Sequence, residues 1–326
     1  MKPIVFSLLF LFISKVGFSQ ISADNDLIIS PDDKLVYLDS SNIETKSKNY
    51  AYIRVIKDFA IDKENYTIEE YYRSGEKRLE GSSKTKDGYS KEGETISYYK
   101  NGTKKSLANY SKGRLNGNDF EWYENGNKKL EGTYIEDEKK RSSQHTINQF
   151  WDKNGTQTVI NGNGFLDDKG EDESSKGEIK NGVKNGYWEG NFLKSKLSYQ
   201  ENYKEGKLIS GQSTDKDNQS YSYTEVETKP EPRNGIMDFY QYIGKNYRIP
   251  KDLPKGSSGK IYIKFVVDKD GKIVEPNILR DLGYGTGEEA IRVLNNCEKW
   301  EPGIQRGRKV RCTYSLPISI QTANLK

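Results

Sequence analysis

The sequence has few of the residues from which most enzyme sites are built. Its 326 residues include one histidine, two cysteines and two methionines. A structural zinc site usually needs four cysteine or histidine ligands, more than the chain contains, and the lone His145 falls in an irregular polar insertion where we expect it to be exposed. No pair among the many carboxylates stands out as a general acid and base. The sequence therefore predicts a protein that is not an enzyme, with no catalytic residue, no metal site and no cofactor.

Long apolar runs are also missing. Apolar residues make up 33% of the chain, charged residues make up 31%, and the mean hydropathy is −0.92. A helix that spans a bilayer needs about 20 mostly apolar residues, so an integral helical membrane protein is excluded. Aromatic residues nevertheless reach 12%, with 23 tyrosines, whereas disordered chains are poor in aromatics. The composition predicts thin, tyrosine-rich sheets joined by many turns.

Residues 1–19 have the pattern of a secretory signal. Lys2 supplies the positive start, Val5–Ile13 is a short apolar run, and the small residues Gly17 and Ser19 suit a signal peptidase. We expect cleavage after Ser19, which places the mature protein in the periplasm. The alternative is an uncleaved signal that keeps the chain at the membrane, although Lys15 leaves an apolar stretch too short to span a bilayer.

A repeated pattern dominates residues 66–226. Each copy has two aromatic residues followed by a glycine-containing turn, and the four clear copies are Tyr71–Lys77, Tyr98–Lys104, Trp122–Lys128 and Phe150–Gly155. Eight Asn-Gly pairs lie between Asn101 and Gly186, and this dipeptide favours two-residue hairpin turns because both positions need positive φ. The repeats predict successive antiparallel hairpins stacked into one sheet, with leading strands in residues 20–65 as its cap.

This pattern resembles the MORN-variant repeats of bacterial antitoxin-like proteins. The resemblance covers about 160 residues. It implies a mainly β scaffold for protein or membrane contacts.

The pattern changes beyond a polar, proline-containing linker at residues 227–236. Residues 237–244 predict a short helix, residues 260–267 alternate as a strand, and Asp268–Gly271 predicts a turn into a return strand at 272–280. Thr286 and Glu289 predict a capping box that starts a second helix, and residues 310–318 alternate as a last strand. The order α-β-β-α-β predicts a small α+β domain over residues 237–320, with a three-stranded antiparallel sheet and two helices, followed by a tail at 321–326.

The order and the residues of this domain resemble the TonB C-terminal domain. The matching segments are Gly259–Gly271, Glu288–Ala290, Lys299–Gly303, Gly307–Arg311 and Leu316–Ile318. The resemblance implies a domain that binds an extended periplasmic peptide, such as the TonB box of an outer-membrane transporter, along its last strand. This is β-augmentation, in which backbone hydrogen bonds add a strand to a sheet edge.

Pro317 independently indicates an edge strand because it lacks an amide hydrogen. The residues that we expect to form the partner-binding edge are Val310, Arg311, Cys312, Thr313, Tyr314 and Ser315. Arg311 is available for acidic partner residues. The alternative is a covered or self-paired edge, as in a homodimer through this domain.

Cys297 falls on the apolar face of the second helix, and Cys312 falls on the apolar face of the last strand. A disulfide between them would close a loop of about 15 residues and add roughly 3 kcal/mol of stability. The alternative is two buried thiols.

Three hypotheses follow for the function. The first is an exported protein that binds a strand of an envelope partner. The second is an energy-transducing TonB component, which requires a membrane anchor, although the chain has only nine prolines and so no long proline-rich spacer. The third is a repeat-led adhesin or antitoxin-like binding protein. Residues 236–326 carry 16 basic and 10 acidic residues, a net charge of +6, but an exported protein rarely meets nucleic acid, so we expect acidic protein partners instead.

Overall fold

The structure is a computed structural model that describes residues 20–21, 27–137 and 142–322. The expected signal at 1–19 and the end of the predicted tail lie outside the described residues. The chain divides into two compact units, one with Met1–Leu166 and Ile179–Val183, the other with Asp167–Glu178 and Lys184–Lys326. Each unit is described separately, and the predicted domain boundaries remain a prediction.

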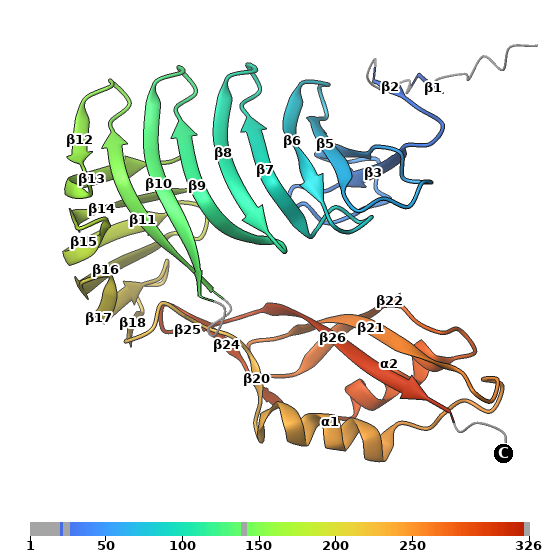
Figure 1. Ribbon diagram of the computed structural model, residues 1–326. Helices are drawn as coiled ribbons and strands as arrows, with labels where there is room; N and C mark the ends of the chain where they lie inside the picture. Colours follow the sequence, from blue (N-terminus) through green and yellow to red (C-terminus); the bar gives the residue numbers. More distant parts are fainter. Residues whose placement is uncertain (1–19, 22–26, 138–141, 323–326) are drawn as a thin grey trace, which may run out of the picture. The chain divides into compact units, whose positions relative to one another are not determined.

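Sixteen strands, from β3 to β18, follow one another in chain order in a single sheet of antiparallel hairpins (Figure 1). This confirms the predicted mainly β repeat array. The strands are β3 (Lys34–Leu38), β4 (Tyr52–Ile56), β5 (Tyr66–Tyr72), β6 (Lys77–Ser83), β7 (Lys91–Tyr98), β8 (Lys104–Ser111), β9 (Arg114–Trp122), β10 (Lys128–Asp137), β11 (Ser142–Trp151), β12 (Gln157–Ile160), β13 (Asn163–Lys169), β14 (Glu173–Lys180), β15 (Val183–Phe192), β16 (Leu197–Lys204), β17 (Lys207–Thr214) and β18 (Ser220–Tyr223). Two short strands, β1 (Gln20–Ile21) and β2 (Ile28–Ile29), pair with each other.

The turns of the four clear repeats differ from the prediction. Only the glycine takes positive φ there, with 104° at Gly75, 81° at Gly102, 86° at Gly126 and 88° at Gly155. Each glycine N–H donates to the carbonyl three residues earlier, the pattern of a type I turn closed by glycine. Two-residue turns with both φ values positive do occur, at Asn161–Gly162 and Asn181–Gly182. The expectation of two-residue turns in the clear repeats was therefore wrong.

A ladder of tyrosine hydroxyls ties each of these repeats to the next. The hydroxyls of Tyr72, Tyr99 and Tyr123 donate to the carbonyls of Tyr98, Trp122 and Trp151, each at 2.9 Å. The ladder stops after the third rung because Asp152 occupies the next equivalent turn position, where its carboxylate accepts two amides of its own turn. Side-chain donors thus reinforce the strand pairing between neighbouring hairpins.

Tyr99→Phe is expected to lower the free energy of unfolding by about 1 kcal/mol, because the Trp122 carbonyl loses its donor while the ring remains. The shift is measured as a change in the urea midpoint. Tyr89→Phe is the matched control, since Tyr89 is 56% exposed and its hydroxyl donates no hydrogen bond within the described residues. Equal midpoints for the two variants would contradict a stabilising ladder.

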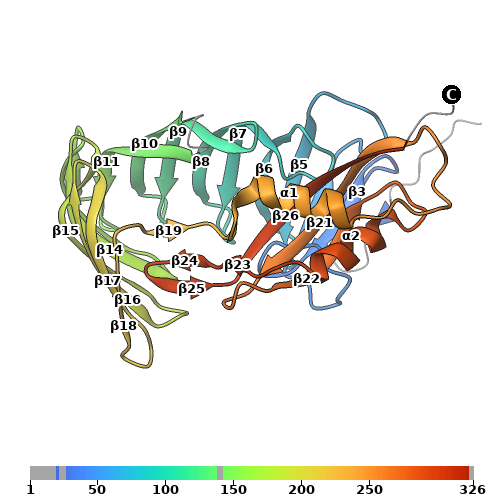
Figure 2. The same ribbon diagram turned by 90° about the horizontal axis from the view of Figure 1, so that it is seen from below.

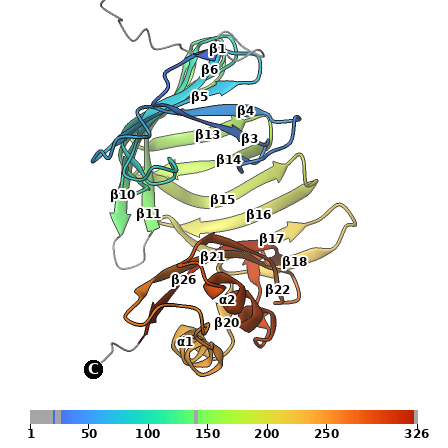
Figure 3. The same cartoon turned by 90° about the vertical axis from the view of Figure 1, so that its right-hand side faces the viewer.

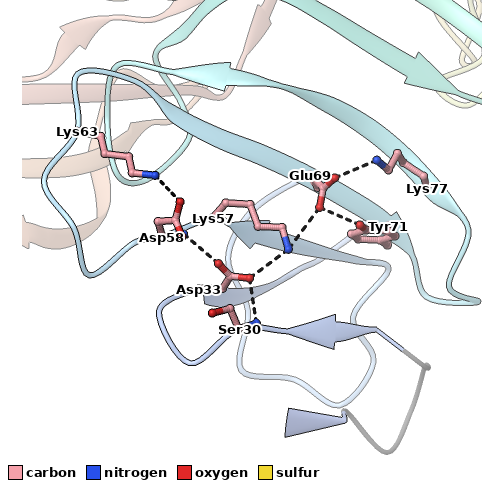
Figure 4. Close-up of polar contacts among 8 residues, drawn as sticks. All are labelled: Ser30, Asp33, Lys57, Asp58, Lys63, Glu69, Tyr71 and Lys77. Atoms are coloured by element: carbon pink, nitrogen blue, oxygen red, sulfur yellow. Dashed lines mark hydrogen bonds and ion pairs between the residues drawn. The ribbon is translucent and has the colours of Figure 1, made fainter. Parts of the chain in front are cut away.

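A buried carboxylate organises the first strands of the array (Figure 4). Asp33 accepts the amides of Ser30 at 3.1 Å and Asp58 at 2.9 Å and the ammonium of Lys57 at 3.1 Å. Burial alone would raise the pKa of Asp33, but these donors hold it below its ordinary value. Lys57 continues the network to Glu69 at 3.7 Å. The network fixes the loop before β3 against the loop after β4.

His145 lies within β11, and not in an irregular insertion as the sequence suggested. Its ring stacks on Tyr134 with centroids 4.1 Å apart, and its Nε2 lies 3.1 Å from Asp119 Oδ2. The interpretation was wrong because β10 and β11 each extend over ten residues and carry the polar stretch into the sheet.

The second compact unit contains the last repeat strands and the C-terminal domain. Strands β16, β17 and β18 lie side by side (Figure 3), and Trp188, Leu197 and Tyr199 of β15 and β16 are at most 4% exposed. These few large side chains form the thin core of the array in this unit.

The C-terminal domain has two helices and a three-stranded antiparallel sheet, as predicted (Figure 2). The helices are α1 (Gly235–Asn246) and α2 (Thr286–Asn295), and the sheet has the order β22 (Ile273–Arg280), β21 (Ser258–Val267), β26 (Cys312–Gln321). Five short strands complete it, namely β19 (Glu227–Thr228), β20 (Glu231–Pro232), β23 (Trp300–Glu301), β24 (Gly303–Gln305) and β25 (Arg308–Val310). Apolar residues of both helices, β21 and β26 form one buried core on one face of the sheet.

Candidate functional site: the outer edge of the C-terminal sheet

Strand β26 is held by the aromatic centre of the core. The Trp300 ring makes edge-to-face contacts with Phe239 at 5.0 Å, Phe265 at 5.6 Å and Tyr314 at 5.0 Å. Along β26, side chains alternate between this core and solvent, as period-two strand geometry requires. The strand is therefore positioned by its buried face, while its other face is exposed.

The outer edge of β26 is long and regular. Ten consecutive residues pair with β21 without a register shift, and no strand pairs with the other side of β26 within the described residues. Beyond the strand, the Thr322 amide continues the ladder by donating to the Ser257 carbonyl at 2.9 Å. Because amide directions alternate along a strand, the amides of Thr313, Ser315, Ser319 and Gln321 point outward. Pro317 belongs to the same set, which explains how a residue without an amide hydrogen fits there.

The other edge of this sheet, strand β22, is less suited to pairing with an added strand. Strand β22 has two register shifts against β21, contains Pro276, and holds Glu275 at a φ of 54°. Bulges and prolines of this kind disrupt the regular row of backbone groups that an added strand needs. The geometry therefore selects β26 as the candidate pairing edge.

The predicted edge residues do not all lie on this edge. Val310 belongs to β25, where it pairs with Gly303, and the exposed Arg311 lies between the strands with its guanidinium 2.6 Å from Glu275. Cys312–Ser315 do begin β26, but only the amides of Thr313 and Ser315 point outward. Leu316–Gln321, which the sequence analysis left out of the site, form the larger part of the edge.

Cys297 and Cys312 are both free thiols in the structure, which corresponds to the second of the two alternatives that the sequence left open. Cys297 packs against the core just after the end of α2. The Cys312 sulfur lies against Gly303, so close that a Cβ added to Gly303 would be 2.3 Å from the sulfur. The two side chains therefore have different neighbours. Burial raises the pKa of Cys297 to about 11 and also raises that of Cys312, which keeps both thiols protonated at neutral pH.

The predicted capping box is not formed either. Thr286 is the first residue of α2 and its hydroxyl donates to the Gly283 carbonyl, while Glu289 binds the Arg248 amide and Arg292. Asp281 instead accepts the Gly287 amide at 3.2 Å. The helix begins one residue earlier than a Thr286 cap would require, because Gly285 supplies the left-handed turn before it and takes the capping position.

The segment expected to be a linker is paired with the C-terminal domain. Strand β19 pairs with β24, and β20 pairs with β23. Pro230 and the Thr228 carbonyl also lie within 3.4 Å of where a Gly303 side chain would begin. Residues 227–232 therefore add two short strands to the domain, so they do not form a loose tether.

The hairpin of β24 and β25 ends in a buried arginine that the sequence analysis missed. Arg306 is 7% exposed, its Nε lies 2.9 Å from the fully buried Glu201, and its guanidinium lies 4.0 Å from the Tyr199 ring centroid. Tyr203 and Tyr223 also donate to Glu201, and burial together with the Glu201 charge raises the pKa of both hydroxyls. The one local signal in the sequence is the glycine after Arg306, which is typical of a turn. The contact with Glu201 could not be predicted, because the two residues are 105 positions apart in the chain.

The same hairpin lies over the last strand of the repeat array. A Cβ added to Gly307 would lie 3.0 Å from the Tyr221 side chain. The Arg306 amide donates to the Val226 carbonyl at 2.7 Å. At the other end of the array, the Thr45 amide donates to the Tyr37 carbonyl of β3, and Leu38 bridges to Glu44. Both terminal strands are thus covered, which protects a sheet from uncontrolled pairing.

Comparison with known proteins agrees with this part of the structure. Residues 253–319 match the family described as Gram-negative bacterial TonB protein C-terminal, a family of envelope-associated, non-enzymatic domains that interact with proteins such as outer-membrane receptors. No curated protein matches the chain. The match supports protein partners and a role in envelope protein interactions, and it covers the whole of β21, β22, α2 and most of β26. Within the described residues, no helix has the length and apolar character needed to cross a membrane.

Proposed function

We propose that this is an exported periplasmic protein that binds an extended segment of an envelope partner by strand addition to β26, with the repeat array as its scaffold. The observation that carries the proposal is the regular ten-residue edge of β26, with its outward amides at Thr313, Ser315, Ser319 and Gln321. A partner strand would form backbone hydrogen bonds with this row. The match to the TonB C-terminal family supports a TonB-box-like segment of an outer-membrane receptor as the partner.

The test is a titration of the full chain with a TonB-box peptide, read as hydrogen-exchange protection of β26. We expect new protection at Ser315 and Ser319 on binding. Ser319→Pro should abolish it, because the variant removes an outward donor and, like Pro317, leaves the ladder to β21 intact. Ser319→Ala keeps the amide and is the matched control.

Unchanged exchange in β26 at millimolar peptide would overturn the proposal. Equal peptide affinity of Ser319→Pro and Ser319→Ala would overturn it as well. A concentration-dependent homodimer that protects the same amides without peptide would identify the edge as a self-association surface instead.

A further inference from the structure

The face of the C-terminal sheet that points away from the helices, here called the open face, carries positive charge beside β26. The strand pairing gives the neighbours across this face. Lys264 lies between Asn277 and Ser315, Tyr262 lies between Arg280 and Pro317, and Lys260 lies beside Ser319. None of these positions is a carboxylate. Neither lysine forms an ion pair within the described residues, and the β26 residues beside them are short and exposed.

These lysines can reach a strand added at the edge. Neighbouring strands lie about 4.8 Å apart, so the added strand would be roughly 10 Å from β21. A lysine side chain covers much of this distance, and the serines at 315 and 319 leave its path clear. Carboxylates of the added strand opposite Ser315 and Ser319 would therefore meet Lys264 and Lys260. Because those positions are four residues apart on one strand, the two carboxylates must also be four residues apart.

The helix side of the edge has the opposite character. Helix α1 covers the β26 side of the sheet, where Phe239 and Ile243 join the core with Leu316 and Ile318 (Figures 1 and 3). Three further residues of α1 form an exposed apolar flank, consisting of Ile236 at 38%, Met237 at 70% and Tyr240 at 39% exposure. Burial raises the pKa of Tyr314 on β26, and Tyr240 is near enough to add to that rise. An added strand would thus turn its helix-side residues toward apolar side chains.

We propose that the β26 edge selects partner strands that carry two acidic residues at positions i and i+4, with apolar residues at i+1 and i+3. The acidic residues face Lys260 and Lys264, and the apolar residues face the α1 flank. This inference rests on the proposed function and adds the chemistry of the partner. A second copy of the domain fits the edge less well, since its β26 would present serines in place of carboxylates and its β21 would add two further lysines to the same face.

The inference is tested with two capped seven-residue peptides of equal composition. The first has the order threonine, glutamate, valine, threonine, valine, glutamate, threonine, which places the glutamates at i and i+4. The second moves the later glutamate to i+3, which turns it to the other face of the strand. The full chain is expected to bind the first peptide about tenfold more tightly, with a preference that falls as salt increases.

Two variants separate this inference from the proposed function. Lys260→Gln with Lys264→Gln should equalise the two peptides and still bind both, because the backbone edge is unchanged. Ser319→Pro should remove binding of both. Equal binding of the peptides to the wild-type chain, with loss of both in Ser319→Pro, would overturn the acidic pattern and leave strand addition standing. Binding of both peptides that is insensitive to Ser319→Pro would overturn strand addition itself.

Discussion

Arg306→Ala is expected to lower the free energy of unfolding of the second compact unit by about 3–5 kcal/mol. The loss is large because Glu201 has no exposed surface and would lose its nearest cationic partner, which leaves only the Lys184 ammonium at 4.0 Å among the described residues. The stacking on Tyr199 and Phe192, at 4.0 and 4.8 Å, would be lost with it. The urea midpoint measures the effect, and hydrogen exchange over residues 197–223 should show that opening begins around Glu201.

Two further variants make the reason for that loss testable. Lys309→Ala removes an exposed cation from the same hairpin and should change the midpoint by less than about 0.5 kcal/mol. Adding Glu201→Gln to Arg306→Ala should recover part of the lost stability, because the neutral amide needs no counter-charge. If the double variant is less stable than Arg306→Ala alone, the loss of the arginine charge beside this buried carboxylate is not the cause.

Gly271→Ala is expected to destabilise the C-terminal domain by about 3 kcal/mol or more, since it combines left-handed strain with a backbone collision. Gly271 has a φ of 80°, and an added Cβ would lie 1.9 Å from the Trp300 carbonyl oxygen. The neighbouring hydrogen bond from the Trp300 amide to the Gly271 carbonyl, at 2.8 Å, holds the two segments in that position. Trp300 cannot move aside without opening the aromatic centre of the core. Thermal unfolding followed by tryptophan fluorescence measures the loss.

Gly283→Ala is the control for this substitution. Gly283 also has a left-handed φ, 74°, but nothing lies within 4 Å of its ideal Cβ. The Gly283→Ala variant should therefore lose only the stability that left-handed strain costs, about 1–2 kcal/mol. Equal losses in the two variants would show that close contact with Trp300 contributes nothing.

The paired linker and Arg306 bear on how the binding edge can work. The family match begins at residue 253, yet Phe239 and Ile243 of α1 and the strands β19 and β20 belong to the same folded domain. The edge of β26 is therefore supported by residues from outside the matched segment. Within the second compact unit, the hairpin that precedes β26 is fixed to β16 through Glu201. A partner strand would therefore add to a β26 whose preceding hairpin is held in place by the Arg306–Glu201 ion pair and by the paired strands β19 and β20.

Much of the architecture could be read from the sequence because it depends on local patterns. Alternation of apolar and polar residues over 260–267 and 310–318 located β21 and β26, and the recurring aromatic and glycine positions located the hairpins. These patterns act within one strand or one turn, where side-chain direction and allowed φ values are fixed by neighbours in the chain. Pro317 indicated an edge for the same local reason.

Tertiary structure decided what those patterns leave open. The sequence could not show that Val310 pairs with Gly303, because alternation gives a strand its faces but not its partners. It could not show which amides of β26 point outward, since that depends on the register with β21. The Asn-Gly pairs of the clear repeats adopt a different turn because their flanking strands are paired with a bulge. The sequence by itself determined the hairpins, the α-β-β-α-β order and the edge at Pro317. Only the folded chain brought Arg306 to Glu201 and the linker to β24, because pairs so distant in sequence are chosen by mutual burial and charge.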